Sequence, residues 1–250
     1  MDASVIIETE ELTKTYHNER AVDRLSFTVN EGEIFGFLGP NGAGKTTTLL
    51  MLLGLTEPTS GTAKVLGWDP TREPIKVKSK IGYLQENMGF YSDLNAKQML
   101  KFVAELNGYT GNHADERIEN ALETVGLAGD GIKKIATYSR GMRQRLGIAE
   151  LLIKDSKIAF LDEPTLGLDP DVTNRMIELI QSLCRDKNMT VLLSSHLLHQ
   201  VQKICHRIGI MIKGRMVAQG PMDQLAKEKF GVGKDAYSLE EIYMKYFQEA

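Results

Sequence analysis

The sequence predicts an α/β fold with a mostly parallel central sheet, and three observations support this prediction. Apolar runs without polar alternation lie at 34–38, 157–161 and 189–193, as is typical of parallel strands buried on both faces. Helix-forming stretches separate these runs, as the crossovers of a parallel sheet require. A glycine-rich turn directly follows the first run and opens into a helical stretch from Thr47 to Gly54.

The glycine-rich turn fits the phosphate-binding pattern G-x-x-x-x-G-K-[ST]. Its residues are Gly39, Pro40, Asn41, Gly42, Ala43, Gly44, Lys45 and Thr46. Glycines allow the backbone N–H groups of such a turn to point at phosphate oxygens, and the following helix adds partial positive charge. Lys45 can reach the β- and γ-phosphates, and the Thr46 hydroxyl suits Mg²⁺. The turn therefore predicts a site for a nucleoside triphosphate.

Composition limits the other functions that this chain could have. The 250 residues are 42% hydrophobic and carry a net charge of −3, so no overall basic field is available to recruit nucleic acid. The two cysteines, Cys184 and Cys205, make no disulfide framework. We expect no signal peptide, and no stretch approaches the roughly 18 apolar residues of a membrane span. Nucleic acid is not an expected partner.

An antiparallel pattern accompanies the parallel one near the N-terminus. An apolar strand is expected from Val5 to Leu12, and Leu25, Phe27 and Val29 alternate with polar residues, as in a half-exposed antiparallel strand. Gly61 to Leu66 continues this pattern. A small antiparallel sheet should therefore lie beside the parallel one.

Helical periodicity dominates from Asn95 to Gly131 and again near the C-terminus. The expected apolar stripes are Ala96, Met99, Val103 and Leu106 on one helix, and Ile118, Ala121, Leu122 and Val125 on the next. Asp169 followed by Pro170 predicts the capped start of a later helix. A strand pair turning at Lys213-Gly214 and amphipathic helices at 221–250 complete the chain.

Two carboxylates end the apolar run at 157–161, namely Asp162 and Glu163. The carboxyl end of a parallel strand faces the same crevice as a phosphate-binding turn in such a sheet. Asp162 is then placed to hold Mg²⁺ through its water shell, and Glu163 to polarise a water that attacks the γ-phosphate. The pair predicts hydrolysis of the triphosphate.

The run from Asp162 to Asp169, together with Tyr138-Ser139-Arg140-Gly141-Met142, resembles the ATP-binding subunits of ABC transporters. The resemblance extends from about Ile6 to Gln219. It implies a P-loop NTPase with a RecA-like parallel core, an antiparallel β subdomain and a helical subdomain inserted at about 90–155. It also implies one ATP-binding domain at 1–220, followed by a C-terminal helical extension at 221–250.

The resemblance assigns roles to individual residues. Gly39 to Thr47 matches the Walker A loop, and Asp162 with Glu163 matches the Walker B pair. Gln85 matches the glutamine that contacts Mg²⁺ and senses the membrane subunit, and His196 matches the switch histidine at the γ-phosphate. Leu166 to Asp169 matches the loop that crosses the dimer interface.

Other residues keep two interpretations. Tyr16 matches the aromatic residue that stacks on adenine, yet it could be an ordinary tyrosine at a strand edge. Gln85 taken alone is more typical of a solvated loop residue than of a ligand. Met88, Phe90 and Tyr91 could receive a helix of the membrane subunit or could simply anchor the helical insertion.

Ser139 and Gly141 occupy the position of the family's signature sequence and open a helix, so they form a second candidate anion site. The resemblance implies that this helix meets the γ-phosphate held by a second subunit in a head-to-tail dimer. Arg140 and Met142 depart from the usual Leu-Ser-Gly-Gly-Gln form. Similar signatures occur in exporter-type branches whose membrane domains are separate chains, and no glutamine role transfers to Met142.

The leading hypothesis is thus a transport ATPase that binds ATP and Mg²⁺ on the cytoplasmic face of the cell membrane. Its expected partners are integral membrane transporter subunits and a second ATPase subunit, as a homodimer or pseudo-dimer. The cargo stays open among drug, lipid and copper-enzyme-maturation systems. The alternatives are a soluble ABC-type ATPase of DNA repair or translation, and an unrelated GTPase or kinase, for which no Asn-Lys-x-Asp motif is present.

Overall fold

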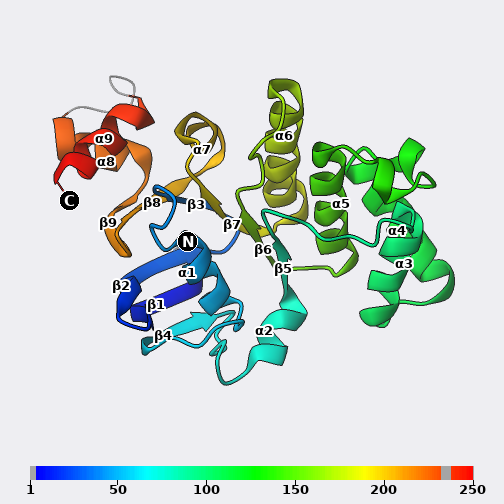
Figure 1. The fold of residues 1–250 in the computed structure, drawn as a ribbon, viewed down its shortest axis with the longest axis horizontal. Coiled ribbons are helices and arrows are strands. Elements are labelled where there is room, and N and C mark those ends of the chain that lie inside the picture. The colour runs from blue at the N-terminus through cyan, green and yellow to red at the C-terminus, as the bar shows by residue number, and fades with distance from the viewer. Residues whose placement is uncertain (1–3, 232–237, 250) are drawn as a thin grey trace.

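The computed structural model describes residues 4–231 and 238–249, whose strands form two sheets (Figure 1). The larger sheet has the order β5 (Ile81–Leu84), β6 (Ile158–Asp162), β7 (Thr190–Ser195), β3 (Ile34–Leu38), β8 (Arg207–Ile212) and β9 (Arg215–Gly220). Its first five strands run parallel, and β9 pairs antiparallel with β8. The smaller sheet is antiparallel, in the order β2 (Glu19–Asn30), β1 (Val5–Tyr16) and β4 (Ser60–Val65). The predicted α/β fold is confirmed.

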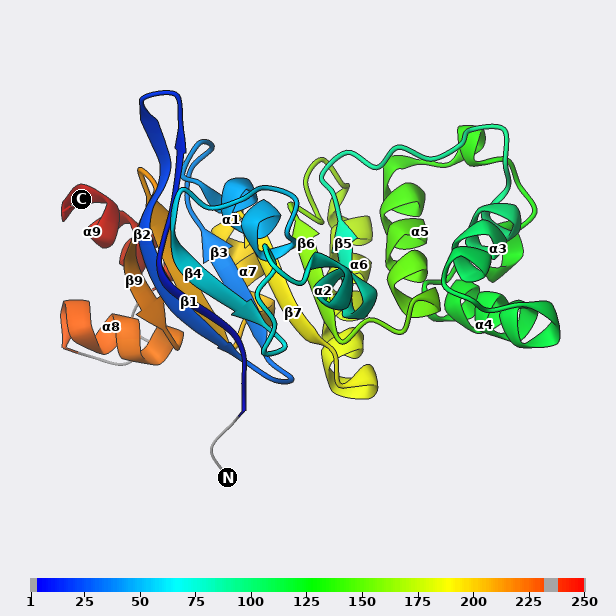
Figure 2. The same cartoon turned by 90° about the horizontal axis from the view of Figure 1, so that it is seen from below.

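The helices lie around and beside the larger sheet. They are α1 (Lys45–Leu52), α2 (Pro74–Lys80), α3 (Ala96–Leu106), α4 (Gly111–Thr124), α5 (Arg140–Ile153), α6 (Pro170–Lys187), α7 (Leu198–Ile204), α8 (Met222–Phe230) and α9 (Leu239–Glu249). Figures 1 and 2 both place α3 and α4 beyond α5 at one end of the molecule, and α8 and α9 at the other. Within the described ranges, no helix is long and apolar enough to cross a membrane.

Alternate residues of the parallel strands supply two separate cores, as the period of two in a strand requires. Phe35, Phe37 and Phe160 point to one face and pack with the antiparallel sheet and α1. The rings of Phe27 and Phe37 meet edge to face with centroids 4.9 Å apart. Leu161 and residues next to these phenylalanines point to the other face and pack with α5, α6 and the C-terminal helices.

The helical insertion begins at a capping box. The Asn95 side chain accepts a hydrogen bond from the Gln98 amide at 2.9 Å, and the Gln98 side chain accepts one from the Asn95 amide at 2.9 Å. The stripe expected on α4 is confirmed, since Ile118, Ala121, Leu122 and Val125 are all buried. The stripe expected on α3 is partly wrong. Leu106 is 70% exposed, whereas Leu100 and Ala104 are buried, because the packed face of α3 follows the i, i+4 row from Ala96.

The helix α6 begins where the sequence predicted, directly after Asp169 and with Pro170 at its first position. The expected cap is absent, however, because the Asp169 side chain makes no capping hydrogen bond and is exposed. The first turn of α6 is instead closed by a backbone hydrogen bond, which the Thr173 amide donates to the Asp169 carbonyl oxygen at 2.8 Å.

The C-terminal helices pack on the body of the same chain. Leu225, Leu239, Ile242 and Tyr246 are buried, and α9 contacts α7, α8 and β8. An ion pair between Lys229 and Glu249 joins α8 to α9. Of the helical extension expected at 221–250, residues 232–237 and Ala250 lie outside the described residues.

Candidate functional site

The site lies where four parallel strands end at the same edge of the sheet. Asp162 pairs with Ser194, and Leu38 pairs with Ser195, so β6, β7 and β3 end side by side. Leu84 pairs with Leu161 on the next strand. The residues that follow these ends are the phosphate loop, His196, Glu163 and Gln85. The register of the sheet thus brings together residues that are distant in sequence.

The backbone of the phosphate loop admits glycine alone at two positions. A Cβ atom on Gly39 would lie 2.3 Å from the Met211 carbonyl oxygen, and one on Gly44 would lie 2.4 Å from that of Ala21. Gly44 also has a φ of +97°, which L side chains rarely adopt, and α1 begins at the next residue. The loop is therefore pressed against the neighbouring strands, while Asn41 and Gly42 at its tip are exposed.

Lys45 is buried at the start of α1 and points back across the loop. Its Nζ donates hydrogen bonds to the Gly39 and Pro40 carbonyl oxygens at 2.7 and 3.2 Å. The same Nζ lies 3.7 Å from Glu163 Oε1, and both side chains are less than one-tenth exposed. Burial lowers the pKa of Lys45, and the negative charges of Glu163 and Asp162 oppose this shift. The ammonium is thus held in place by weak partners that a phosphate could replace.

Asp162 connects the phosphate loop to the two strands beside its own. The Thr46 hydroxyl donates to Asp162 Oδ2 at 2.9 Å, and the Ser194 hydroxyl donates to Oδ1. The Tyr83 hydroxyl lies 3.5 Å from Oδ2. Burial and the Asp162 charge raise the pKa of Tyr83 well above its usual range, so its hydroxyl keeps its proton. Hard oxygen donors from Thr46 and Asp162 therefore lie within hydrogen-bond distance of each other, as a Mg²⁺ site needs.

Glu163 is held by a strained backbone and contacts the histidine that follows β7. Its φ of +49° is unusual for a residue with a side chain, and its amide donates to the Ser194 carbonyl oxygen at 3.1 Å. Its Oε1 lies 2.9 Å from His196 Nδ1. Its Oε2 is buried and has no hydrogen-bond partner among the described residues. An orphaned carboxylate oxygen at this position is suited to accept a proton or a hydrogen bond from water.

The helix start at Ser139 and Gly141 lies apart from this cluster. The Ser139 side chain accepts a hydrogen bond from the Met142 amide at 3.3 Å and so caps α5. Gly141 packs against α6, because a Cβ there would lie 2.4 Å from Val172. No hydrogen bond or ion pair found in residues 4–231 and 238–249 joins either residue to the phosphate loop.

The remaining sequence-predicted residues lie at the rim. Gln85 is exposed at the end of β5, and Asp169 is exposed before α6. Tyr16, at the end of β1, is 44% exposed, and the Lys14 ammonium lies 5.0 Å from the centre of its ring. None of these three side chains contacts Lys45, Asp162 or Glu163 through a hydrogen bond in the described part of the chain.

Met88, Phe90 and Tyr91 divide between their two interpretations. Met88 and Phe90 are half-buried and pack on the hydrophobic core of the helical insertion. Tyr91 is 63% exposed, and its ring meets that of Phe102 edge to face at 6.4 Å. The first two anchor the insertion, and only Tyr91 is presented to solvent.

Sequence reasoning missed Ser194 and Tyr83 as partners of Asp162. No local signal marks either residue, because both contacts depend on strand register: Ser194 is the register partner of Asp162, and Tyr83 pairs with Phe160. It also missed Phe247 of α9, which lines a cavity together with the phosphate loop. No local signal marks Phe247, since the contact depends on how the C-terminal helices fold back.

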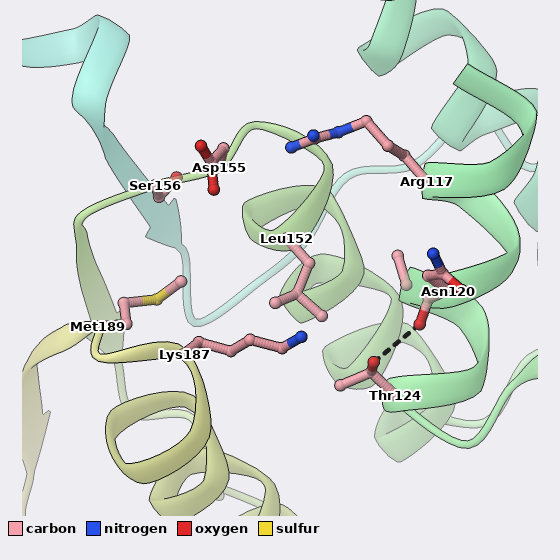
Figure 3. A pocket seen from close by; sticks show the side chains of 9 residues that line it. Arg117, Asn120, Thr124, Leu152, Asp155, Ser156, Lys187 and Met189 are labelled. Atoms are coloured by element: carbon pink, nitrogen blue, oxygen red, sulfur yellow. Dashed lines mark hydrogen bonds between the residues drawn. The ribbon is translucent and has the colours of Figure 1, made fainter. Parts of the chain in front are cut away.

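A separate cavity of about 270 Å³ lies at the opposite edge of the sheet, where β6 and β7 begin (Figure 3). Arg117 of α4, Leu152 of α5 and Lys187 of α6 line it, with Asp155 and Ser156 from the loop before β6. None of the sequence-predicted site residues lies there.

Comparison with known proteins supports what this geometry suggests. The family model described as ABC transporter matches residues 22–166, more than half of the chain. This chain belongs to the ABC transporter ATP-binding family. The assignment accounts for the phosphate loop and for the acidic strand end beside it.

Several curated members of the ABC family resemble the chain over most of its length. It is 41% identical to the bacitracin transport ATP-binding protein BcrA of Bacillus licheniformis, over 90% of this chain and 72% of that protein. It is 37% identical to the linearmycin resistance ATP-binding protein LnrL of Bacillus subtilis, over 90% of this chain and 72% of that protein.

Solved structures of ABC ATP-binding subunits share the fold. One ATP-binding subunit of an ABC transporter superposes with a TM-score of 0.86 at 27% identity, covering 97% of this chain and 99% of that one. An ATP-binding cassette in a dimeric post-hydrolysis state, bound to ADP and Pi, superposes with a TM-score of 0.78 at 23% identity, over 86% of this chain and 98% of that one. The chain is a transport ATPase that binds and hydrolyses ATP and acts with membrane partner subunits.

Proposed function

We propose that this chain is the ATPase subunit of an exporter-type ABC system, with Glu163 as the base of hydrolysis. The observation that carries the proposal is the convergence of Lys45, His196 and Glu163 at one end of the parallel sheet. Glu163 has one oxygen oriented by His196 and the other without a partner among the described residues. That second oxygen would accept the proton of the attacking water.

Lys45 and the loop amides would bind the β- and γ-phosphates. In the structure the Lys45 ammonium is satisfied by backbone carbonyl oxygens at the loop, which are weaker partners than phosphate. Because the ammonium is already desolvated, an incoming phosphate would gain a strong interaction at little further cost of burial. His196 would contact the γ-phosphate from the end of β7 while fixing the orientation of Glu163.

Mg²⁺ fits the oxygen donors at Thr46 and Asp162, with Gln85 as a further ligand from the end of β5. When bound, the ion would neutralise phosphate charge and align the β- and γ-phosphates. The hydroxyls of Ser194 and Tyr83 hold the Asp162 carboxylate from both sides, so its orientation is set before nucleotide arrives.

A second subunit would complete the site. Ser139 and Gly141 are separated from the phosphate loop of their own chain, and Asn41 and Gly42 at the loop tip are exposed. A head-to-tail homodimer, or a pseudo-dimer with a related subunit, would bring the α5 N-terminus of one chain over the nucleotide of the other. Asp169 would cross the same interface. The dimeric form of the ADP-bound structural neighbour supports an assembly of two subunits.

Tyr16 would stack on the adenine ring. It is the exposed aromatic residue at the end of β1, and a flat π-face is what base stacking requires. The Lys14 ammonium above one face would leave the other face for the base.

The domain division follows the motifs, with one ATP-binding domain at 1–220, helical subdomain at about 90–155, and an extension at 221–250. The Tyr-Ser-Arg-Gly-Met signature and the relatives named for bacitracin and linearmycin favour a drug-type cargo, moved from the cytoplasmic face by integral membrane subunits. A non-transport role in DNA repair or translation has no specific observation in its favour.

Affinity purification from the membranes of its native cell tests this function. A tagged chain, solubilised in mild detergent, should bring along an integral membrane protein in stoichiometric amount. If the exposed Tyr91 contacts that partner, as we propose, Tyr91→Ala should weaken the complex. The exposed Ile132 is the matched control for that substitution. If the chain purifies without any membrane protein, the soluble alternative gains and the transport role fails.

A further inference from the structure

The C-terminal helix α9 reaches the phosphate loop of the same chain. A cavity of about 260 Å³ is lined by the loop residues Pro40 to Ala43, by Ile212 and Lys213, and by Phe247 of α9. Phe247 and the loop are about 200 positions apart in sequence. The last helix of the chain thus forms a wall beside the loop that binds the triphosphate.

Phe247 is presented at this wall and is not part of the core. Its neighbours on α9 fix the helix, since Ile242 and Tyr246 are buried and Glu249 pairs with Lys229 of α8. The Tyr246 hydroxyl donates to Glu228 at 3.3 Å, which adds a second link to α8. Phe247 nevertheless stays 43% exposed, and its ring stacks on Tyr243 at 5.9 Å. The helix is held firmly while its apolar ring faces outward.

The tip of the phosphate loop, which lines this cavity, is also open to solvent. Asn41 and Gly42 are exposed, and a Cβ built on Gly42 would meet nothing within 4 Å. The described residues that line the cavity therefore include an aromatic ring on a firmly held helix and a stretch of exposed loop backbone. Such a surface can be covered from outside without any rearrangement of the chain.

We propose that α9 is a second contact region of the ATP-bound dimer, in which Phe247 packs against the second copy of this chain. This inference rests on the head-to-tail dimer proposed above. The segment of the second copy that covers the nucleotide must approach the tip at Asn41 and Gly42. Phe247 lines the same cavity as that tip, so a surface that covers the cavity would contact both.

Charge also favours a second copy as the occupant. Lys213 lines the cavity and is exposed. The loop proposed to cross the interface ends at the exposed Asp169, and the exposed Asp171 follows it in α6. Both carboxylates carry a charge complementary to that of Lys213. In a twofold dimer each contact occurs twice, so one substitution at Phe247 removes two aromatic contacts. Aromatic residues, phenylalanine included, are enriched in protein–protein interfaces.

Dimerisation of the full chain with Glu163→Gln tests the proposal, because this background holds ATP without turning it over. Adding Phe247→Ala should raise the dimer dissociation constant in ATP by about tenfold or more. Met244→Ala is the matched control, since Met244 is 48% exposed on the same helix and does not line the cavity. It should change the constant by less than about twofold, and Phe247→Tyr should restore dimerisation. ATP affinity of the dilute single chains should be the same in all variants.

A photo-crosslinking phenylalanine analogue at position 247 gives a second readout that keeps the ring. It should form an ATP-dependent adduct between two chains, and the same analogue at position 244 should not. Equal dimerisation of the Phe247→Ala and Met244→Ala variants, or an adduct within one chain alone, would overturn the role of α9 and leave the dimer intact. Failure of the Glu163→Gln chain itself to dimerise with ATP would overturn the head-to-tail dimer and this inference with it.

Discussion

The imidazole Nδ1 of His196 lies 2.9 Å from Oε1 of Glu163. The same carboxylate oxygen is 3.7 Å from the Lys45 ammonium, so both groups engage one oxygen and leave the other unpartnered in the described structure. Glu163 and His196 follow the neighbouring strands β6 and β7, and Lys45 belongs to the phosphate loop. The arrangement orients the proposed base before any nucleotide binds.

His196→Ala should lower kcat by about 10²-fold or more, because Glu163 loses its orienting contact and the γ-phosphate loses a donor. ATP affinity should change little, since the phosphate loop and Lys45 remain. Steady-state phosphate release and equilibrium ATP binding separate the two effects. His199→Ala is the control, because this exposed histidine lies three positions further along the chain, in α7. Equal loss in both variants would contradict the role of His196.

Lys45→Ala should weaken ATP binding by about tenfold or more, since a desolvated charge contact to phosphate is removed. Binding of a fluorescent ATP analogue measures the change. Lys76→Ala removes a lysine that is 60% exposed and pairs with Glu73, and it should bind ATP as the native chain does. Native affinity in Lys45→Ala would refute the phosphate-loop assignment.

Ser194→Ala should lower kcat by about tenfold and raise the Mg²⁺ concentration needed for half-maximal activity, because Asp162 loses one of the three hydroxyl groups that contact it. Ser194→Thr keeps the hydroxyl and should restore the Mg²⁺ dependence. Titration of ATPase activity with Mg²⁺ provides the readout. If kcat falls while the Mg²⁺ titration stays unshifted, Ser194 acts through Glu163 and not through Asp162. The Ser194 hydroxyl also contacts the Glu163 amide.

Stability should depend on pH through Glu150 of α5. Burial raises the pKa of this carboxyl to about 7, and its Oε1 is buried without a partner among the described residues. Because the folded pKa lies above the unfolded one, stability falls as pH rises from about 4.5 to 7 and then stays level. Glu150→Gln removes the charge and should stabilise the chain by up to about 3 kcal/mol at pH 8 and little at pH 4.5.

Thermal unfolding at both pH values checks this prediction, with the exposed Glu116→Gln as control. A gain from Glu150→Gln of equal size at both pH values would show that titration of Glu150 is not its cause.

Local patterns were enough to predict most of the fold. Strand β3, with all five residues buried, and the alternation of β2 both followed from apolar periodicity. Leu106 was misplaced because a stripe of period 3.6 on an 11-residue helix fits more than one face, and contacts with α4 and α5 decide which face is buried. The prediction that Asp169 caps α6 was wrong, because the sequence indicates where a cap can form but does not determine the side-chain rotamer that the capping hydrogen bond needs.

The candidate site likewise contains residues that local patterns predict and residues that they do not. Lys45 and the loop glycines lie in one continuous motif, so sequence sufficed for them. Ser194 and Tyr83 depend on strand register, which a single sequence does not determine. Phe247 depends on the packing of α8 and α9 onto the body, a tertiary event without a local signature. The sequence thus predicts the residues proposed to contact the nucleotide better than it predicts the residues that position them.

The central claim, that Glu163 is the base of hydrolysis, is tested most directly by phosphate release from the Glu163→Gln chain at saturating ATP. Glu178→Gln, on the exposed side of α6, is the control. We predict that Glu163→Gln lowers turnover by about 10²- to 10⁴-fold while ATP still binds. Turnover equal to that of the native chain would contradict the account.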